Sequence, residues 1–318
     1  SGGLSAGILV GFNMLAGRVS RPIIDLVTLK TEITKLLQSL QIVSGIVDAN
    51  SETTVKGQKP QLMGQVSFKN VEFGYDDETK ILKNVNLEIN PRQIVGITGK
   101  SGCGKSTMAK LIQGLYRPQS GIVALDNTDL RLLDLSHIRS QVSLVGTESY
   151  FFPGTIRENI SRPMPNSSMD RITWATKKVF AHEEIESFPD AYETFLEENA
   201  SNISTGLRQK FAIARALIRN PRILILDDAI SGFDIDSEIK LYDALPDIAL
   251  GRTVIIVSNR LYHLRLCNKV FVLDKGTIKQ EGSFDNLKDI PGFFSDTFYK
   301  QTSILGMAQQ KKIIKKAV

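Results

Sequence analysis

A nine-residue segment, Gly99-Lys-Ser-Gly-Cys-Gly-Lys105-Ser106-Thr107, constrains the fold of this chain more than any other feature. It fits the pattern G-x-x-x-x-G-K-[ST], in which a glycine-rich loop leads from a strand into a helix. The apolar residues 94–98 precede it, and a stretch rich in Met, Ala, Leu and Ile follows it. This context makes a chance glycine-rich turn a poor alternative, so we predict an α/β domain built around the loop.

Each part of this loop has a predicted role in binding a nucleotide. Glycines let backbone N–H groups converge on phosphate oxygens, and the N-terminus of the following helix adds partial positive charge. Lys105 is expected to reach the β- and γ-phosphates, and the Ser106 hydroxyl to bind Mg²⁺, an ion that prefers oxygen ligands. The loop residues predicted to bind ATP are Gly99, Ser101, Gly102, Cys103, Gly104, Lys105, Ser106 and Thr107.

A second candidate ligand of Mg²⁺ lies in the segment Ile223-Leu-Ile-Leu-Asp227-Asp228. An apolar strand that ends in a carboxylate holds Mg²⁺ opposite such a loop in nucleotide-hydrolysing enzymes. Many strands end in Asp, so this pattern alone is weak. Together with the glycine-rich loop, it predicts Asp227 as a ligand of the metal.

The remaining apolar patterns predict the architecture of the domain. Two segments, 66–73 and 81–89, alternate apolar and polar residues like antiparallel strands. Four short runs are almost entirely apolar, which is typical of buried parallel strands: 94–98, 142–145, 223–226 and 254–257. Residues from about 150 to 220 look mostly helical. We therefore predict a mostly parallel core sheet, an antiparallel β subdomain and an inserted helical subdomain.

The front of the chain has a different character. Residues 4–15 are apolar and rich in small residues, but they are too few to span a bilayer, which needs about 20. This segment is either a buried core helix or the cytoplasmic end of a membrane helix, and Arg18 and Arg21 directly after it favour the second alternative. Apolar residues then recur at helical spacing over 22–47, which predicts one long amphipathic helix.

These patterns divide the chain into four parts. Residues 1–48 are predicted to be the end of a transmembrane helix and its cytoplasmic extension, the last such helix according to the family resemblance given below, and 49–63 a linker. Residues 64–300 are predicted to be the nucleotide-binding domain, and 301–318 a basic tail. Because the chain begins at Ser1 without a Met, we expect it to be a fragment of a longer protein.

Charge and cysteine content argue against several functional classes. The formal net charge is +5, and the basic residues are scattered apart from four lysines between 311 and 316. A nucleic-acid-binding protein usually carries a basic stripe on one element, so no nucleic acid is expected as a partner. Cys103 and Cys267 have the spacing of neither a disulfide framework nor a zinc site.

The chain resembles the ATP-binding domains of ABC transporters over residues 60–300. Ile203-Ser-Thr-Gly-Leu-Arg-Gln-Lys-Phe-Ala-Ile-Ala-Arg-Ala-Leu217 resembles the L-S-G-G-Q signature helix of that family. Tyr75 resembles the aromatic residue that stacks on adenine, and Ser231-Gly-Phe-Asp234 is similar to the loop that crosses the dimer interface. Gly154-Thr-Ile-Arg-Glu-Asn-Ile160 is similar to the segment after the glutamine loop of exporters, and Glu198 resembles an acidic residue that contacts the membrane domain.

This resemblance implies a dimer of two ATP-binding domains. Each ATP would lie between the glycine-rich loop of one domain and the signature of the other, so Ser204, Thr205 and Gly206 would act on the partner's ATP. ATP binding would close the pair and hydrolysis would reopen it. The transmembrane domain of the same transporter, whose helices this cycle would move, is a second implied partner.

The front of the chain resembles a narrower group. Phe12-Asn-Met-Leu-Ala-Gly-Arg-Val-Ser-Arg-Pro22 is similar to the end of the sixth membrane helix in bacterial type I secretion transporters, the hemolysin-exporter group. That resemblance implies export of a protein or peptide, at the cytoplasmic face of the bacterial inner membrane. The same resemblance implies two further partners, a periplasmic adaptor and an outer-membrane channel.

Four motifs around the γ-phosphate depart from the pattern of the family, at five positions. Asp228 stands where the family has a catalytic Glu, Asn259 where it has the switch His, and Thr147 where the glutamine loop has its Gln. In the signature, Thr205 replaces the first Gly and Leu207 replaces the Gln. The residues that bind nucleotide are intact and those that hydrolyse it are altered, so we predict slow hydrolysis.

Three functions remain as alternatives. The first is an exporter subunit that hydrolyses ATP slowly beside a more complete partner, and the second is a regulatory or scaffold subunit that uses ATP as a structural clamp. The third is a soluble ABC ATPase of DNA repair or translation, against which the membrane-helix remnant and the linker argue. His263, one turn after Asn259, is expected on a helix surface and not as a substitute for the switch His.

Overall fold

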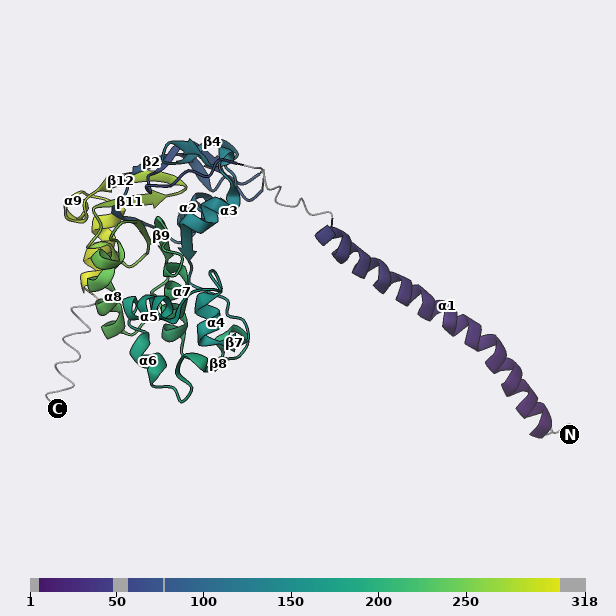
Figure 1. Ribbon diagram of the computed structural model, residues 1–318. Coiled ribbons are helices and arrows are strands. Elements are labelled where there is room, and N and C mark those ends of the chain that lie inside the picture. The colour runs from purple at the N-terminus through teal and green to yellow at the C-terminus, as the bar shows by residue number, and fades with distance from the viewer. Residues whose placement is uncertain (1–5, 48–56, 77, 304–318) are drawn as a thin grey trace, which may run out of the picture. The chain divides into compact units, whose positions relative to one another are not determined.

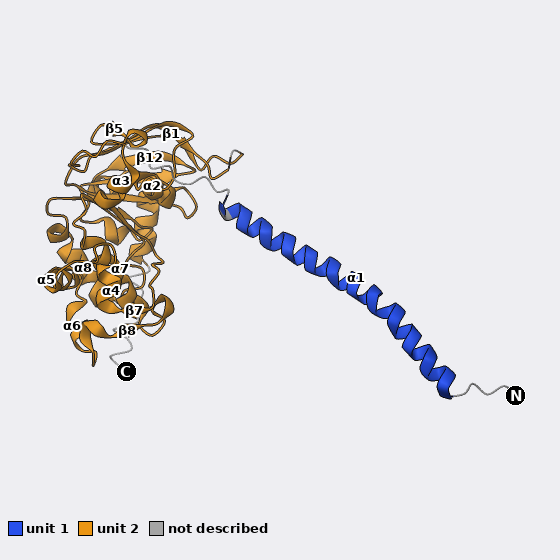
Figure 2. Ribbon diagram, turned by 45° about the vertical axis from the view of Figure 1, so that its right-hand side comes forward, with its two compact units in different colours: residues 1–53 blue, residues 54–318 orange. Residues whose placement is uncertain are grey.

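A computed structural model describes residues 6–47, 57–76 and 78–303, and the chain forms two units, 1–53 and 54–318 (Figure 2). In the first unit, Ala6–Val47 form one helix, α1, so the helix predicted over 22–47 begins earlier than expected, with Pro22 inside it. Within the described ranges, no helix is both long and apolar enough to cross a membrane. Most of the predicted linker and the terminal lysines lie outside the described residues.

The second unit is built around a six-stranded sheet in the order β12-β11-β3-β10-β9-β6 (Figure 1). Strands β11, β3, β10, β9 and β6 run parallel, and β12 pairs antiparallel with β11. All four apolar runs predicted as buried parallel strands are confirmed. The bounds are β3 Ile94–Gly99, β6 Val142–Val145, β9 Ile223–Asp227, β10 Thr253–Val257, β11 Lys269–Asp274 and β12 Thr277–Gly282.

Alternate side chains of the central strands enter two separate hydrophobic cores. In β10, Val254 and Ile256 join one core, and Ile255 and Val257 join the other. Successive residues of a strand point to opposite faces, so a strand buried on both faces must be apolar throughout. This is the physical reason why the central strands could be recognised from uninterrupted apolar runs.

One core lies under a second, antiparallel sheet, and the other lies under helices. The antiparallel sheet has the order β2-β1-β4-β5, which confirms the two alternating segments as paired strands. Its strands are β1 Val66–Phe73, β2 Leu82–Ile89, β4 Ser120–Leu125 and β5 Thr128–Asp129. Strands β7 Gly154–Thr155 and β8 Phe195–Leu196 form a small separate pair.

The helices between β6 and β9 form a group of their own. Helices α4, α5, α6 and α7 gather at the end of this unit away from the antiparallel sheet, whose labelled strands are β2 and β4 in Figure 1 and β1 and β5 in Figure 2. Their bounds are α4 Ile156–Ser161, α5 Met169–Lys178, α6 His182–Glu186 and α7 Thr205–Leu217. This unit also contains α2 Lys105–Ile112, α3 Leu135–Gln141, α8 Ile235–Ile248 and α9 Phe284–Asp289, and residues 293–303 are helical as well.

Candidate nucleotide-binding site

Four neighbouring strands bring the predicted site residues to one edge of the core sheet. In the parallel ladder, Val257 of β10 lies beside Ile97 of β3 and Asp227 of β9. Val145 of β6 lies beside Leu226. The loops that follow β3, β10, β9 and β6 therefore leave the sheet at the same edge, which is where open α/β sheets bind their ligands.

The glycine-rich loop between β3 and α2 needs its glycines for two distinct reasons. Gly99 has φ 148° and Gly104 has φ 109°, a region of backbone conformation that other residues rarely adopt. A Cβ atom at Gly99 would lie 2.0 Å from the backbone oxygen of Leu273, and one at Gly104 would lie 2.6 Å from the Leu82 side chain. The loop can follow this path only with glycine at both positions.

Lys105, at the start of α2, is buried inside the loop that it follows. Its Nζ donates hydrogen bonds to the backbone oxygens of Gly99, at 2.9 Å, and Lys100, at 3.0 Å. The ammonium group is thereby held at the centre of the loop, where backbone N–H groups and the N-terminus of α2 also converge. Burial raises the pKa of the neighbouring Cys103 thiol, which keeps it neutral beside this cation.

Ser106 and Asp227 come together from α2 and β9 as the sequence analysis expected of a shared metal. The Ser106 hydroxyl lies near the Asp227 carboxylate and favours its charged form. Burial raises the pKa of Asp227 above its ordinary value, Asp228 reinforces this effect, and Ser106 and Lys105 oppose it. A cation bound here would offset the cost of a buried carboxylate, because it favours the charged form.

The two oxygens fit Mg²⁺ as part of a site that ATP would complete. In the part of the chain that the structure describes, no group of three or more His, Cys, Asp and Glu side chains could hold a metal alone. Mg²⁺ in nucleotide sites is usually bound through one or two protein oxygens, with phosphate and water supplying the rest. Ser106 and Asp227 would supply these one or two protein oxygens.

Tyr75 lies beside the glycine-rich loop, half-exposed, as a residue that stacks on a base must. Its hydroxyl lies 3.2 Å from the hydroxyl of Thr107 in α2. Its ring packs edge-on against Phe73 and Tyr116, at centroid distances of 5.2 and 5.1 Å. The Lys110 ammonium lies over the ring, 5.6 Å from its centroid, and 49% of the residue is exposed to a ligand.

The three altered positions of the predicted hydrolytic machinery lie at the same edge of the sheet. Asp228 follows β9 with φ 48°, and its backbone N–H donates to Val257 at 2.9 Å. Asn259 follows β10 and is exposed, while its backbone oxygen accepts a hydrogen bond from Gln301 at 2.9 Å. Thr147, also exposed, lies two residues beyond the end of β6.

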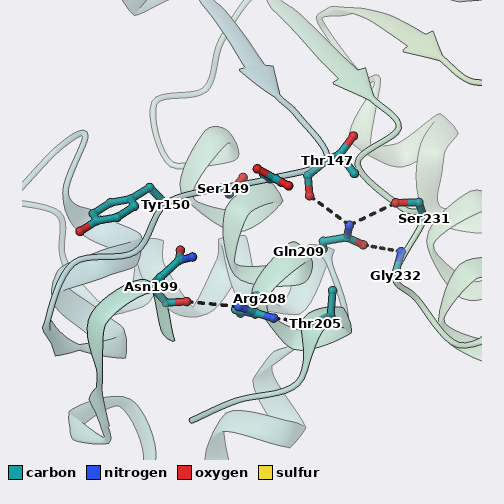
Figure 3. A pocket seen from close by; sticks show the side chains of 10 residues that line it. Thr147, Ser149, Tyr150, Asn199, Thr205, Arg208, Gln209, Ser231 and Gly232 are labelled. Carbon is teal, nitrogen blue, oxygen red and sulfur yellow. Dashed lines mark hydrogen bonds between the residues drawn. The ribbon is translucent and has the colours of Figure 1, made fainter. Parts of the chain in front are cut away.

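Thr205 of the signature segment and Thr147 line the same hollow of the surface. This hollow of about 670 Å³ is lined by ten residues from three loops and α7, and none of the predicted ATP-binding loop residues is among them (Figure 3). Ser204 is the N-cap of α7, where its side chain accepts a hydrogen bond from the N–H of Leu207. The Thr205 hydroxyl accepts a hydrogen bond from Arg208 at 3.0 Å, so this replacement of a glycine is accommodated on the surface.

Gln209 is a residue that the sequence reasoning missed. Its side chain joins three segments: it donates to the backbone oxygen of Thr147 and the hydroxyl of Ser231, and accepts from the N–H of Gly232 at 2.8 Å (Figure 3). Helix α7 and the loop leading to Asp234 approach so closely that a Cβ atom at Gly206 would lie 3.1 Å from the Gly232 oxygen. No local pattern reveals such contacts, since they join segments far apart in the sequence.

The expectation that His263 lies on a helix surface was wrong. His263 is only 4% exposed, because it lies in a short 3-10 turn, Leu261–Leu264, and not on the outer face of a helix. Its Nδ1 lies 3.0 Å from the Ser258 hydroxyl, and its Nε2 hydrogen-bonds to Glu238 of α8. The 3-10 turn rotates successive side chains by a different angle from an α-helix, which helical spacing did not anticipate.

A family profile described as "ABC transporter" matches residues 82–231, which begin in β2 and end in the loop after β9. The domain belongs to the ABC transporter family. The matched range contains Lys105, the Ser204–Gly206 segment and Asp227, so the family relation covers both the glycine-rich loop and α7.

Individual relatives point to a subgroup. The chain is 39% identical over 289 residues to the leukotoxin translocation ATP-binding protein LktB of Pasteurella haemolytica-like sp. (strain 5943B), covering 90% of this chain and 41% of that protein. It is 38% identical over 298 residues to the leukotoxin export ATP-binding protein LtxB of Aggregatibacter actinomycetemcomitans, covering 93% and 42%. The chain thus spans about two fifths of the length of these relatives.

A solved structure supports the same assignment of fold. A bacterial Atm1-family ABC exporter with ATP bound aligns with a TM-score of 0.79 and 29% identity, over 94% of this chain and 53% of that one. The predicted fold class, an ABC ATPase domain preceded by a helix, is therefore confirmed.

Proposed function

We propose that this chain is the ATP-binding part of a bacterial exporter of proteins or peptides of the type I secretion class. The domain would bind Mg·ATP between its glycine-rich loop and the signature of a second ABC domain. It would lie at the cytoplasmic face of the inner membrane, and residues 1–48 would be the end of the last transmembrane helix with its extension. The similarity to LktB and LtxB, proteins of leukotoxin translocation and export, supports this choice of cargo class.

The observation that carries the proposal is the convergence of Lys105, Ser106 and Asp227 at the ends of β3 and β9. The buried ammonium group would neutralise phosphate charge, and Ser106 with Asp227 would hold Mg²⁺. Held there, the metal would supply positive charge that stabilises the negative charge of the phosphates during transfer. Tyr75, beside α2, would stack on the adenine.

Hydrolysis at this chain's own site is proposed to be slow. Asp228 is one methylene shorter than Glu, so its carboxylate would lie about 1.5 Å further from an attacking water. Displacements of about 1 Å can reduce a rate by about 100-fold. Asn259 can donate a hydrogen bond to a γ-phosphate but cannot carry the positive charge of a protonated His. Thr147 is too short to copy a Gln that bridges Mg²⁺ and the membrane domain.

A second candidate is a subunit that binds ATP as a clamp and does not hydrolyse it. It is favoured by the signature, where Leu207 is 5% exposed and packs in the core, so that it offers no polar group to a partner's nucleotide. The Ser204 side chain is already engaged as the cap of α7. A complete second exporter chain in the same complex would favour the first candidate, and a lone homodimer the clamp.

The decisive first experiment measures Mg·ATP binding by calorimetry. The wild-type chain should bind ATP with a micromolar to millimolar Kd, and Lys105→Ala should abolish binding because the phosphates lose their main cation. Lys83→Ala, which removes an exposed lysine of β2, is the charge-matched control and should bind normally. Equal affinity in wild type and Lys105→Ala would refute the assignment. Steady-state ATPase activity, with and without a complete partner chain, then separates slow hydrolysis from a clamp.

A further inference from the structure

His263 is buried yet fully engaged in polar contacts, and it does not belong to the loop that binds phosphate. Its two ring nitrogens face different segments, Nδ1 toward Ser258 at 3.0 Å and Nε2 toward Oε1 of Glu238. The ring also stacks on Tyr242, with centroids 4.7 Å apart and planes inclined by 27°. A buried polar ring that is held on both edges and one face has a single well-defined position.

These contacts hold the loop that carries Asn259. Ser258 immediately precedes Asn259, and its hydroxyl also accepts a hydrogen bond from the N–H of Arg260 at 3.1 Å. On the other side, Gln301 donates to the backbone oxygen of Asn259 and accepts from the N–H of Leu261, both at 2.9 Å. The backbone on either side of Asn259 is therefore fixed, while the Asn259 side chain is exposed.

Glu238 connects the same loop to the loop between β9 and α8. It lies in the first turn of α8, whose N-cap is Asp234, with Oδ1 accepting from the N–H of Ser237 at 2.9 Å. Its second oxygen, Oε2, accepts a hydrogen bond from Arg260 at 3.2 Å. His263 and Arg260 thus bind the two oxygens of one carboxylate, and both come from the segment around Asn259.

We propose that His263 is a positioning residue: through Ser258 and Glu238 it sets the place of Asn259 against the γ-phosphate of bound ATP. The inference rests on the proposed function, because Asn259 meets a γ-phosphate only if ATP binds at the 99–107 loop. His263 itself touches no phosphate, since it is buried beneath the loop. Its effect should therefore appear only where the nucleotide has a γ-phosphate and Asn259 is present.

The test compares the affinities of Mg·ATP and Mg·ADP for the full chain, by calorimetry, in a double-mutant cycle. Wild type should prefer ATP, and Asn259→Ala should reduce that preference by about 10-fold, as expected for a hydrogen bond to a charged group. His263→Leu should cause most of the same loss, and the double variant should lose no more than Asn259→Ala alone. His263→Gln should keep the preference, because an amide can accept from Ser258 and donate to Glu238.

Several outcomes would overturn the inference. A His263→Leu chain with a normal ratio of ATP to ADP affinity would do so, as would losses that simply add to those of Asn259→Ala. If His263→Leu does not fold, Ser258→Ala removes the Nδ1 contact without placing an alkyl group beside Glu238, and the same ratio decides. ATP binding by wild type with no effect of Asn259→Ala refutes only the positioning role, whereas no ATP binding by wild type refutes the proposed function itself.

Discussion

At the scale of single residues, Asp228 combines an unusual backbone conformation with a shortened carboxylate side chain. Its φ of 48° lies in the left-handed region, where Asp and Asn are several-fold more common than most other residues. Its N–H is held by Val257 of the adjacent strand, so the backbone cannot relax easily. The sequence showed the shorter carboxylate but not this conformation, which a Glu at the same position would adopt at some cost.

The first prediction at this scale concerns hydrolysis. Asp228→Glu combined with Asn259→His should raise the rate by about 10-fold or more, because the pair restores a base of full reach and a group able to stabilise charge on the γ-phosphate. The two changes affect one transition state, so their effects should not add. Single-turnover hydrolysis would be measured in a closed dimer whose partner has a complete signature and an inactivated site. A wild-type chain as fast as the double variant would show that the altered residues do not slow hydrolysis.

A second prediction separates two roles of Tyr75. Tyr75→Ala should weaken ATP binding several-fold, because stacking on a base contributes about 0.5–1.5 kcal/mol. Tyr75→Phe should bind ATP normally and lose only the contact with Thr107, at a cost in stability of about 1 kcal/mol or less. Calorimetry and urea unfolding measure the two effects separately. Equal losses of ATP affinity in both variants would show that the hydroxyl, and not the ring, binds the nucleotide.

At the scale of elements, the sequence predicted what depends on local pattern and failed where distant segments meet. The apolar runs of β3, β6, β9 and β10 were recognised because a strand covered on both faces is apolar at nearly every position. The glycine-rich loop was recognised because its glycines meet steric demands at fixed spacing. The burial of His263 depends on Glu238, which is 25 residues away in the sequence. The burial of Gln209 depends on two separate loops. Periodicity along one segment contains no information about such contacts.

Helix α4 offers a test of stability within the helical group. Thr155 and Glu158 form a capping box, in which each side chain accepts a hydrogen bond from the other's backbone N–H. Thr155→Ala should lower the free energy of unfolding by about 1 kcal/mol, since it leaves a helix N–H without its partner. Thr155→Ser keeps the oxygen and should unfold near the wild-type denaturant concentration. If both variants lose the same stability, the methyl group and not the cap is responsible.

At the scale of the whole molecule, the ATP-binding domain should fold without α1. All buried core residues of the described part lie at Leu62 or beyond, so α1 contributes none of them. The fragment 54–318 should therefore unfold at the same temperature as the full chain and bind ATP equally well, as measured by calorimetry.

A fragment that starts at residue 65 provides the contrast. It lacks Leu62, which is 1% exposed, and the contact of Pro60 with the His137 ring, so it should unfold at a lower temperature. Equal stability of the two fragments would show that 54–64 is dispensable. A large loss on removal of 1–53 alone would instead show that α1 contributes to the fold.

If two such domains pair as proposed, the three hydrogen bonds of Gln209 should couple the two nucleotide sites of the dimer. They link α7, which would face the partner's ATP, to the loops after β6 and β9, which leave the core sheet at the edge of the chain's own proposed nucleotide site. ATP binding at one site would then change the affinity of the other site for ATP. Thermodynamic linkage makes this effect equal in both directions. Nucleotide binding to the dimer should be cooperative, with a Hill coefficient above one. Gln209→Ala should bring that coefficient toward one without abolishing binding, which equilibrium titration with a fluorescent ATP analogue can measure.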